Sequence, residues 1–298
     1  AQTIFKVDRD YAIDLCREML ENIEDFKSDK GYEVFYKDFP KEVMNMEEAD
    51  IYINQMLHYW FGYIPKHKNL KNKNLENQEF ESKINKELNE EILGIYGKIK
   101  KDISKAILGY KNAWKGTEKE VFAEMAFCIL TPQSKAKNAW QAITTLVENN
   151  LLYEGSAEEI VEYLNIVRFK NNKSRYLVEF RDLMTKDEKL QPKKILESKG
   201  NTFEKRKWIL KNVKGMGLKE ANHVLRNLGF GEEIAILDRH ILRNLQRLNV
   251  IEEIPKTLTE KKYYEIEKAM KKYSEYSGIK MDELDLVLWY KEAGEVFK

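Results

Sequence analysis

The stretch Val213-Lys214-Gly215-Met216-Gly217-Leu218-Lys219-Glu220-Ala221 predicts two helices joined by a tight glycine turn. Glycines two positions apart allow positive φ angles and leave the backbone uncovered. The N–H groups that open the second helix then point outward with the positive end of the helix dipole, which suits phosphate binding. Such a hairpin would grip any DNA backbone without reading its bases. A plain helix–helix turn with capping glycines is an equal alternative for this motif alone.

Lys219 falls in the first turn of the second predicted helix. The helix dipole and desolvation by a bound nucleotide both disfavour an ammonium there. Both effects therefore favour the neutral amine, which can attack carbon as a nucleophile. The alternative is an exposed lysine without a special role, as is usual in a lysine-rich chain.

Asp238 follows the apolar run Ala235-Ile236-Leu237 and precedes a predicted helix over Arg239–Leu248. Aspartate is a favoured N-cap, and capping alone would account for it. The same carboxylate, held ionised and oriented, can also stabilise positive charge on a sugar C1′ or relay protons to and from Lys219. The lysine and the aspartate together predict covalent chemistry on DNA.

The rest of the chain predicts a mainly α protein. Only 5 prolines and 14 glycines interrupt long segments with helical apolar spacing. The expected helices after residue 81 are one or two over Leu88–Leu108, a core helix over Glu118–Leu130, and further helices over Ala136–Glu148, Ala157–Asn165, Ser174–Met184, Phe203–Asn212, Arg239–Leu248, Glu260–Ser277 and Met281–Ala293. Pro132 ends the core helix at the turn Thr131-Pro132-Gln133-Ser134.

Charge divides the chain into two expected domains. Residues 1–80 hold 11 Lys+Arg and 16 Asp+Glu, a net of −5, whereas residues 81–298 hold 40 and 34, a net of +6. The Asn- and Lys-rich segment near residues 66–80 is typical of a linker. We therefore expect an acidic, mostly helical accessory domain over 1–80 and a catalytic domain over 81–298.

Composition also excludes several classes of protein. Two cysteines, Cys16 and Cys128, are too few for a disulfide framework or a four-cysteine iron–sulfur cluster. The four histidines are scattered without metal-ligand spacing, so we expect no metal at a catalytic centre. No apolar run reaches the length of a membrane span. These features predict a soluble intracellular, cytoplasmic protein with no membrane partner.

Several ordered motifs resemble the helix-hairpin-helix DNA glycosylases, and more narrowly the second, archaeal-type class of 8-oxoguanine DNA glycosylase/AP lyases. The resemblance runs from about Ile84 to the C-terminus. Its motifs are Phe127–Thr131, Val167–Phe169, Val213–Glu220, Ala235–Arg243 and Leu284–Tyr290. It implies a two-lobed helical fold and base-excision repair of DNA that contains oxidised guanine.

The resemblance also implies the roles of individual residues. Lys219 would be the Schiff-base nucleophile, and Asp238 its catalytic partner. The flipped base would enter a pocket formed by Phe169, Asp285, Trp289 and Lys298. Gln133, with Ser134 beside it, would enter the gap that this base leaves.

Contacts to DNA phosphates are expected from the hairpin and from nearby cations. The candidates are Lys214, Gly215, Gly217, Arg239, Arg243, Lys173 and Arg175. The resemblance requires no cofactor, although a monovalent cation can bind at hairpin carbonyls. Residues 1–80 have no counterpart in the compact family pattern, and a protein partner is one role for them. Two other functions stay open, namely a non-catalytic DNA-binding scaffold and a glycosylase for a different damaged base.

Overall fold

The computed structural model of the 298-residue chain describes residues 78–297. Residues Glu79–Lys298 form one compact unit, so its first residue lies close to the expected domain start at 81. Residues 1–77 of the expected N-terminal domain, which include most of its linker, lie outside the described residues, as does Lys298. Residues 78–80 of that linker belong to a helical segment over 78–83.

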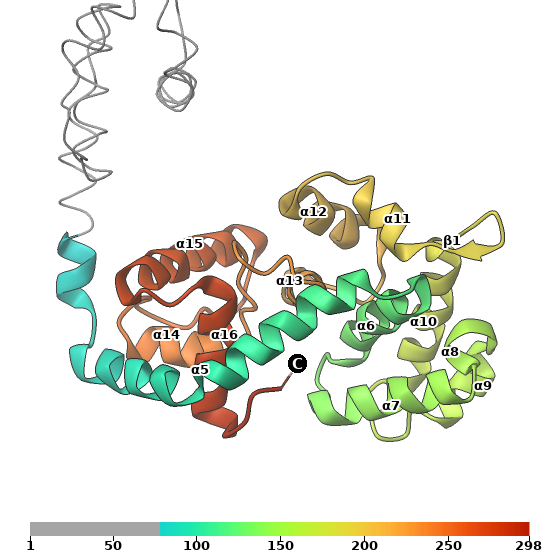
Figure 1. Ribbon diagram of the computed structural model, residues 1–298, viewed down its shortest axis with the longest axis horizontal. Coiled ribbons are helices and arrows are strands. Elements are labelled where there is room, and N and C mark those ends of the chain that lie inside the picture. Colours follow the sequence, from blue (N-terminus) through green and yellow to red (C-terminus); the bar gives the residue numbers. More distant parts are fainter. Residues whose placement is uncertain (1–77, 298) are drawn as a thin grey trace, which may run out of the picture. The chain divides into compact units, whose positions relative to one another are not determined.

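The described chain is almost entirely helical, which confirms the predicted fold class (Figure 1). Its helices are α5 Lys86–Lys115, α6 Glu118–Leu130, α7 Ala136–Glu148, α8 Leu151–Glu154, α9 Ala157–Glu162, α10 Lys170–Met184, α11 Pro192–Glu197, α12 Thr202–Asn212, α13 Leu218–Asn227, α14 Arg239–Arg247, α15 Glu260–Ser277 and α16 Met281–Ala293. A two-residue hairpin pairs β1 Thr185–Lys186 with β2 Lys189–Leu190 in antiparallel register.

Local sequence signals explain several helix boundaries. Thr117 and Glu120 form a capping box at the start of α6, and their mutual hydrogen bonds satisfy backbone groups that the helix leaves free. The segment over Leu88–Leu108, expected to be one helix or two, lies within the single helix α5, whose buried stripe runs from Ile92 to Tyr110. Sequence periodicity missed the short elements α8, α11 and the β hairpin, because a single turn or a two-residue strand carries too little pattern.

Two apolar cores build the described unit. The first is formed by α6 to α13, and the second by α5, α14, α15 and α16 together with the segment 235–237. In Figure 1 the helices of the two cores lie on either side of α13, and α5 runs from one group to the other. The predicted two-lobed arrangement is therefore confirmed, with the glycine hairpin at the junction.

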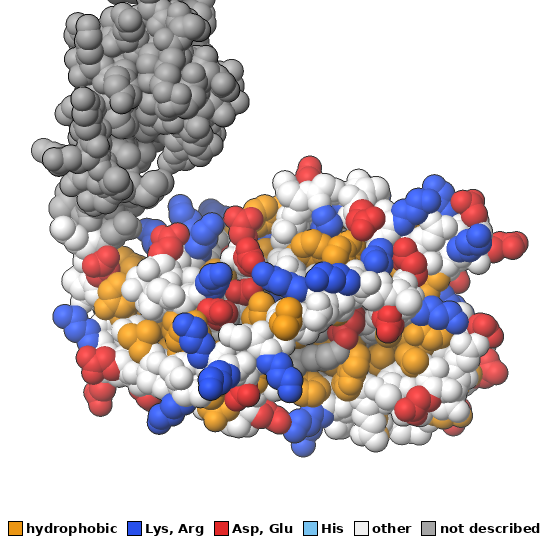
Figure 2. Space-filling view, in the orientation of Figure 1, with side chains coloured by type: hydrophobic (Ala, Val, Ile, Leu, Met, Phe, Trp, Pro, Cys, Tyr) orange, Lys and Arg blue, Asp and Glu red, His pale blue; other side chains and the backbone are white. Residues whose placement is uncertain are grey.

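The surface carries charges of both signs. On the face shown in Figure 2, basic and acidic side chains are interspersed rather than separated into fields. None of the helices within residues 78–297 combines the length and apolarity that a bilayer span requires.

A buried polar cluster joins the two cores behind the hairpin. Arg206 of α12 donates two hydrogen bonds to the Glu267 carboxylate of α15, at 2.8 and 2.9 Å, and both residues are buried. Glu267 Oε1 also accepts the Ala235 N–H at 2.9 Å. This carboxylate therefore ties the hairpin's first helix to the segment that leads into Asp238.

Asn222 and Tyr263 complete the cluster. The Asn222 amide donates to the Ala235 carbonyl at 2.7 Å, and the Tyr263 hydroxyl donates to the same oxygen at 2.6 Å. The Leu237 N–H in turn donates to the Tyr263 hydroxyl at 3.2 Å. The backbone over 235–237 is thus held by side chains from α13 and α15, which fixes where the following residue, Asp238, begins α14.

We expect Glu267→Ala to lower the free energy of unfolding by about 3–5 kcal/mol, because it leaves the Arg206 guanidinium buried without its partner. Glu265→Ala on the same helix is the matched control, since its partner Lys262 is exposed and the pair contributes less than about 1 kcal/mol. Urea unfolding of the two variants measures the difference. Equal effects would show that the cluster does not stabilise the junction.

Candidate active site

A cavity of about 390 Å³ opens at the junction of the two cores. It collects residues from the turn after α6, from α13, from the start of α14 and from α16. The predicted residues Lys219, Asp238, Asp285, Trp289 and Gln133 all line it, as does Ser134. Side chains up to about 150 positions apart in the sequence thus meet in one place, as the family resemblance implies.

The glycine hairpin has the predicted form. Val213 ends α12, Gly215 has a φ of +80°, and Gly217 is the N-cap of α13. A Cβ atom on Gly215 would lie 2.6 Å from the ring of Tyr176 in α10. Glycine is therefore required at position 215 for two reasons: the backbone is left-handed there, and the Tyr176 ring leaves no room for a Cβ atom.

The backbone N–H groups that could bind a phosphate do not include that of Gly217. The Gly217 N–H donates to Glu220 Oε2 at 3.1 Å, as in a capping box. Among the described residues, the N–H groups of Leu218 and Lys219 have no acceptor and point from the first turn of α13. A phosphate would therefore bind one residue further along than the glycines themselves suggest.

Lys219 is the second residue of α13 and is half-buried, with 26% of its side chain exposed. Its ammonium lies 3.6 Å from Glu220 Oε1. The helix thus presents an amine at the cavity wall with a loose ion pair beside it, and a bound substrate can displace this contact more readily than a tight one.

Asp238 is the N-cap of α14, as predicted. Its Oδ1 atom accepts the N–H groups of His240 and Ile241, both at 2.8 Å. Both cap bonds use the same oxygen, and Oδ2 has no hydrogen-bond partner within the described part of the chain. One oxygen fixes the carboxylate, and the other is left for chemistry in the cavity.

Asp285 lines the cavity and is only 6% exposed. Burial raises the pKa of Asp285 to about 6, an effect opposed by the Arg226 guanidinium and reinforced by the charge of Asp238. Arg226 lies 3.5 Å from Asp285 Oδ2 and donates to the Tyr110 hydroxyl of α5. Asp285 is therefore a carboxyl whose charge changes just below neutral pH, inside the same electrostatic field as Lys219 and Asp238.

Trp289 lies one helical turn after Asp285 on α16 and forms an aromatic wall. Its indole meets the His240 ring edge-on, with centroids 5.0 Å apart, and His240 Nδ1 lies 3.6 Å from Glu292 Oε2. Contacts of this kind hold an indole ring in one orientation. The wall suits stacking against a planar base.

The turn Thr131-Pro132-Gln133-Ser134 projects into the cavity from the end of α6. Its backbone closes with a hydrogen bond from the Ser134 N–H to the Thr131 carbonyl at 3.0 Å. Gln133 is exposed at its tip with a φ of +55°, a conformation that few residues other than glycine adopt. An exposed side chain held in a strained turn fits the wedge role expected for Gln133.

Lys173 is not available for a phosphate, so the prediction of a phosphate contact is wrong for this residue. It is 3% exposed, and its Nζ donates to the carbonyls of Leu130 and Pro132 and to Ser134 Oγ, at 2.7, 2.8 and 3.0 Å. Burial lowers the pKa of Lys173 to about 8. At neutral pH each of the three N–H groups of the ammonium therefore has an acceptor within the protein, and none is left for a phosphate.

The other cations expected to contact DNA lie on the surface. Lys214 forms an ion pair with Glu179 at 2.8 Å, with most of its side chain exposed. Arg175 hydrogen-bonds within its own helix to Asn171 and Asn172. Arg239, the first residue of α14, and Arg243, in the middle of that helix, are exposed and form no ion pair with any described residue. These arginines remain candidates for phosphate contacts.

Phe169 does not line the cavity. It precedes α10 in the left-handed conformation, with a φ of +58°, and the residue is 56% exposed. Lys298 lies outside the described residues, but its neighbour Phe297 lines the cavity. Asp285 and Trp289 therefore line the cavity, and the base-pocket roles of all four residues stay predictions.

Sequence reasoning missed several lining residues. They are Thr131, Lys135, Ala136, His223, Arg226, Ile236, His240, Leu286 and Phe297. Arg226 had no local signal, because it falls among the buried residues of an amphipathic helix and only its contacts with α5 and α16 reveal it. The described residues contain no cluster of three or more His, Cys, Asp or Glu side chains placed to hold a metal ion.

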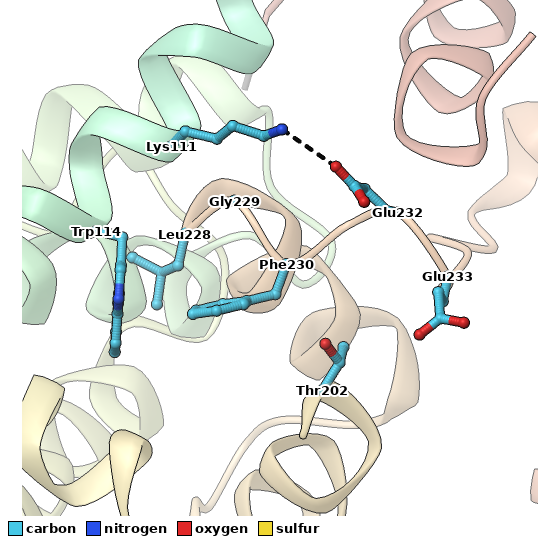
Figure 3. Close-up of a pocket in the computed structure, with 8 residues that line it drawn as sticks. All are labelled: Lys111, Trp114, Thr202, Leu228, Gly229, Phe230, Glu232 and Glu233. Carbon is cyan, nitrogen blue, oxygen red and sulfur yellow. Dashed lines mark hydrogen bonds and ion pairs between the residues drawn. The ribbon is translucent and has the colours of Figure 1, made fainter. Parts of the chain in front are cut away.

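A second cavity, of about 380 Å³, lies between α5 and the loop after α13 (Figure 3). Its walls are the aromatic pair Trp114 and Phe230, with ring centroids 5.0 Å apart, and the ion pair Lys111–Glu232. Lys219 and Asp238 are not among its lining residues. The cavity at the hairpin is therefore the candidate active site.

Comparison with known proteins agrees with this geometry. A family model described as "8-oxoguanine DNA glycosylase" matches residues 103–279, more than half of the chain. The chain belongs to the 8-oxoguanine DNA glycosylase family. A relative from Fusobacterium nucleatum, named 8-oxoguanine DNA glycosylase/AP lyase, is 58% identical over 209 residues, which are 70% of this chain and 96% of the relative. The family predicted from the sequence is thereby confirmed.

Solved structures show the same fold. The Methanocaldococcus jannaschii 8-oxoguanine glycosylase/lyase, in complex with a 15mer DNA containing 8-oxoguanine, is 36% identical with a TM-score of 0.65, and the match covers 71% of this chain and 99% of that one. The 8-oxoguanine DNA glycosylase of Thermotoga maritima is 32% identical with a TM-score of 0.64, covering 72% and 99%. This chain is thus longer than these relatives and contains nearly all of their structure.

We expect Gly215→Ala to destabilise the protein by about 1–3 kcal/mol, because alanine disfavours a φ of +80° and its Cβ would collide with the Tyr176 ring. DNA binding should weaken with it, since the hairpin must shift. Gly109→Ala in α5 is the control, where an added Cβ meets nothing within 4 Å and should stabilise by about 0.5–1 kcal/mol. Thermal unfolding and fluorescence anisotropy measure both effects. A stable Gly215→Ala with unchanged DNA affinity would contradict the assigned role of the hairpin.

Proposed function

We propose that this chain is a bifunctional DNA glycosylase/AP lyase that removes 8-oxoguanine from double-stranded DNA and cleaves the strand at the resulting abasic site. The observation that carries the proposal is a nucleophile-bearing helix and a capping carboxylate facing one cavity with an aromatic wall. Family membership and the printed activity of the relatives support it. Its place of action is the intracellular compartment that holds DNA.

The reaction begins after the damaged nucleotide has left the helix stack. The neutral amine of Lys219 attacks C1′ while the bond between C1′ and the base nitrogen breaks, and the base leaves with that electron pair and takes up a proton. The lysine nitrogen then loses a proton and forms a double bond to C1′ as the C1′–O4′ bond breaks, and O4′ leaves with that electron pair and takes up a proton. The product is a Schiff base between Lys219 and C1′ of the opened sugar. Loss of a proton from C2′ then expels the 3′ phosphate by β-elimination, and water releases the lysine.

Asp238 acts on charge and protons in these steps. Asp238 lines the cavity, and its Oδ2 atom, which makes no hydrogen bond with the described residues, stabilises positive charge at C1′ and accepts the proton that Lys219 must lose before it attacks. Trp289 stacks on the extruded base, and Asp285, which lines the same cavity, is a hydrogen-bonding group for it. Phe169 and Lys298 would complete this pocket on binding.

The hairpin can also hold a monovalent cation. Within the described chain, the carbonyl groups of residues 213–216 accept no backbone hydrogen bond, so they remain available as oxygen ligands. A bound cation would add positive charge beside a DNA phosphate at the N–H groups of α13. The reaction itself needs no cofactor.

A borohydride trapping experiment tests the nucleophile. With a duplex that contains 8-oxoguanine, the native protein should form a covalent adduct, and Lys219→Gln should form none because its amide cannot make a Schiff base. Lys211→Gln, an exposed lysine at the end of α12, should trap as the native protein does. A native protein that binds DNA without trapping would instead favour the non-catalytic scaffold, and trapping with another lesion alone would favour a different damaged base.

Asp238→Asn separates catalysis from folding at the same position. Asparagine is as good an N-cap as aspartate, so the hydrogen bonds from His240 and Ile241 and the stability of α14 should persist. The carboxylate charge is lost, and we expect base release to slow by about 10² or more while DNA affinity changes little. Single-turnover kinetics give the rate, and full activity of this variant would refute the role of Asp238.

The rate of base release should depend on pH through the ionisation of the Asp285 carboxyl. Its carboxyl is mostly protonated at pH 5 and mostly ionised at pH 7, because burial places its pKa at about 6. The ionised form adds negative charge beside a reaction that develops positive charge, so the rate should rise roughly tenfold between these pH values. In Asp285→Asn this rise should disappear. A rise that survives the substitution would assign the ionisation to another group.

A further inference from the structure

Lys173 takes no part in the reaction described above, yet its buried ammonium lies directly behind the candidate active site. It projects from the first turn of α10 and reaches the turn 131–134 at the end of α6. Two of its acceptors, Leu130 O and Pro132 O, belong to the backbone just before Gln133. The third, Ser134 Oγ, follows Gln133. The Lys173 ammonium therefore hydrogen-bonds the turn on both sides of Gln133, the exposed residue at its tip.

The same bonds reach a second loop. Ser134 Oγ also accepts the backbone N–H of Arg168 at 2.9 Å, and the next residue, Phe169, begins α10. The Phe169 carbonyl accepts the Lys173 N–H at 3.0 Å. Lys173 and Ser134 thus connect the loop that carries Phe169 to the turn that carries Gln133.

Each of these loops places one exposed residue in a strained conformation. Gln133 has a φ of +55° and Phe169 a φ of +58°. Gln133 occupies the third position of a proline turn, where positive φ favours glycine or asparagine. Side chains other than these keep such conformations only when their surroundings hold them there. The Lys173 ammonium restrains the turn 131–134 directly. It restrains the loop before α10 through Ser134 Oγ, which also accepts the Arg168 N–H.

We propose that Lys173 is the positioning residue for base extrusion, because it holds Gln133 and Phe169 as one rigid unit that enters the duplex. The inference rests on the proposed function. Gln133 then fills the space that the extruded base leaves, and Phe169 follows the base towards Trp289. Lys173 itself touches neither DNA nor the reacting atoms.

This role concerns extrusion and not bond breaking, so it predicts a specific kinetic pattern. A duplex with 8-oxoguanine must unstack and unpair a base before Lys219 can attack. A duplex with a preformed abasic site has no base to extrude, and Lys219 reaches C1′ without that cost. Loss of the restraint should therefore slow base excision far more than cleavage at an abasic site.

Lys173→Met tests this pattern, since methionine preserves the length and apolar volume of the side chain and removes the ammonium. In single-turnover assays we expect excision of 8-oxoguanine to slow by about a hundredfold, because small misplacements of positioning groups have effects of this size. Cleavage of the abasic duplex should change by less than about threefold. A 2-aminopurine next to the lesion should show a smaller or slower rise in fluorescence, which reports unstacking directly.

Lys205→Met is the matched control. Lys205 is also buried and also donates to a backbone carbonyl, that of Gly200, but it lies in α12 away from both loops. This substitution should leave the ratio of excision to abasic-site cleavage unchanged even where it lowers stability. The comparison separates a positioning role from a general loss of folding.

Ser134→Ala keeps the test decisive if Lys173→Met fails to fold. It removes only the hydroxyl that accepts from both Lys173 and Arg168, and it should reduce excision selectively but less severely. In the double variant the two effects should not multiply, because both break the same connection. Equal losses of excision and abasic-site cleavage, or no loss of either, would overturn the proposal. Failure of the native protein to trap on 8-oxoguanine DNA would instead refute the proposed function.

Discussion

The carboxylate of Glu267 is the constraint on which the candidate active site depends. It binds Arg206 from the hairpin's first helix and the Ala235 N–H from the other core, in a place that excludes water. A buried carboxylate needs all of these partners, because each unsatisfied lone pair would cost free energy. The interaction therefore has one favourable geometry. Because Ala235 lies three residues before Asp238, and Arg206 belongs to the helix before the hairpin, this geometry determines the position of Asp238 relative to Lys219.

The catalytic pair comes from two different cores. Lys219 follows a hairpin packed in the first core, whereas Asp238, Asp285 and Trp289 belong to elements of the second. A buried second link crosses the same junction, where Arg226 of α13 contacts Tyr110 of α5 and Asp285 of α16. Because these links are directional, they orient the two lobes more strictly than apolar packing alone would. The cavity is thus a property of the junction and not of either lobe.

The elements with strong local signals could be predicted from the sequence, and the residues that act through distant contacts could not. The glycine hairpin, the Asp238 cap and the core helix α6 each follow from neighbouring residues, and the structure has all three. The family resemblance implied a pocket role for Trp289 and for Asp285 one helical turn before it, and both residues line the cavity. Lys173 was misread as a phosphate contact, because nothing within its own segment reveals three acceptors some 40 positions earlier. Glu267 and Arg226 were missed for the same reason.

Lys173 shows that lysine charge in this fold serves two different purposes. A lysine on the surface can neutralise any phosphate, but it restrains nothing, because its side chain is free to move. A buried lysine is held in one conformation, and its hydrogen bonds fix the backbone segments whose carbonyl groups accept them. Lys219 lies between these limits, half-buried with one loose ion pair. That intermediate position suits a nucleophile, which must be held near its target and still be released from its partner when the substrate arrives.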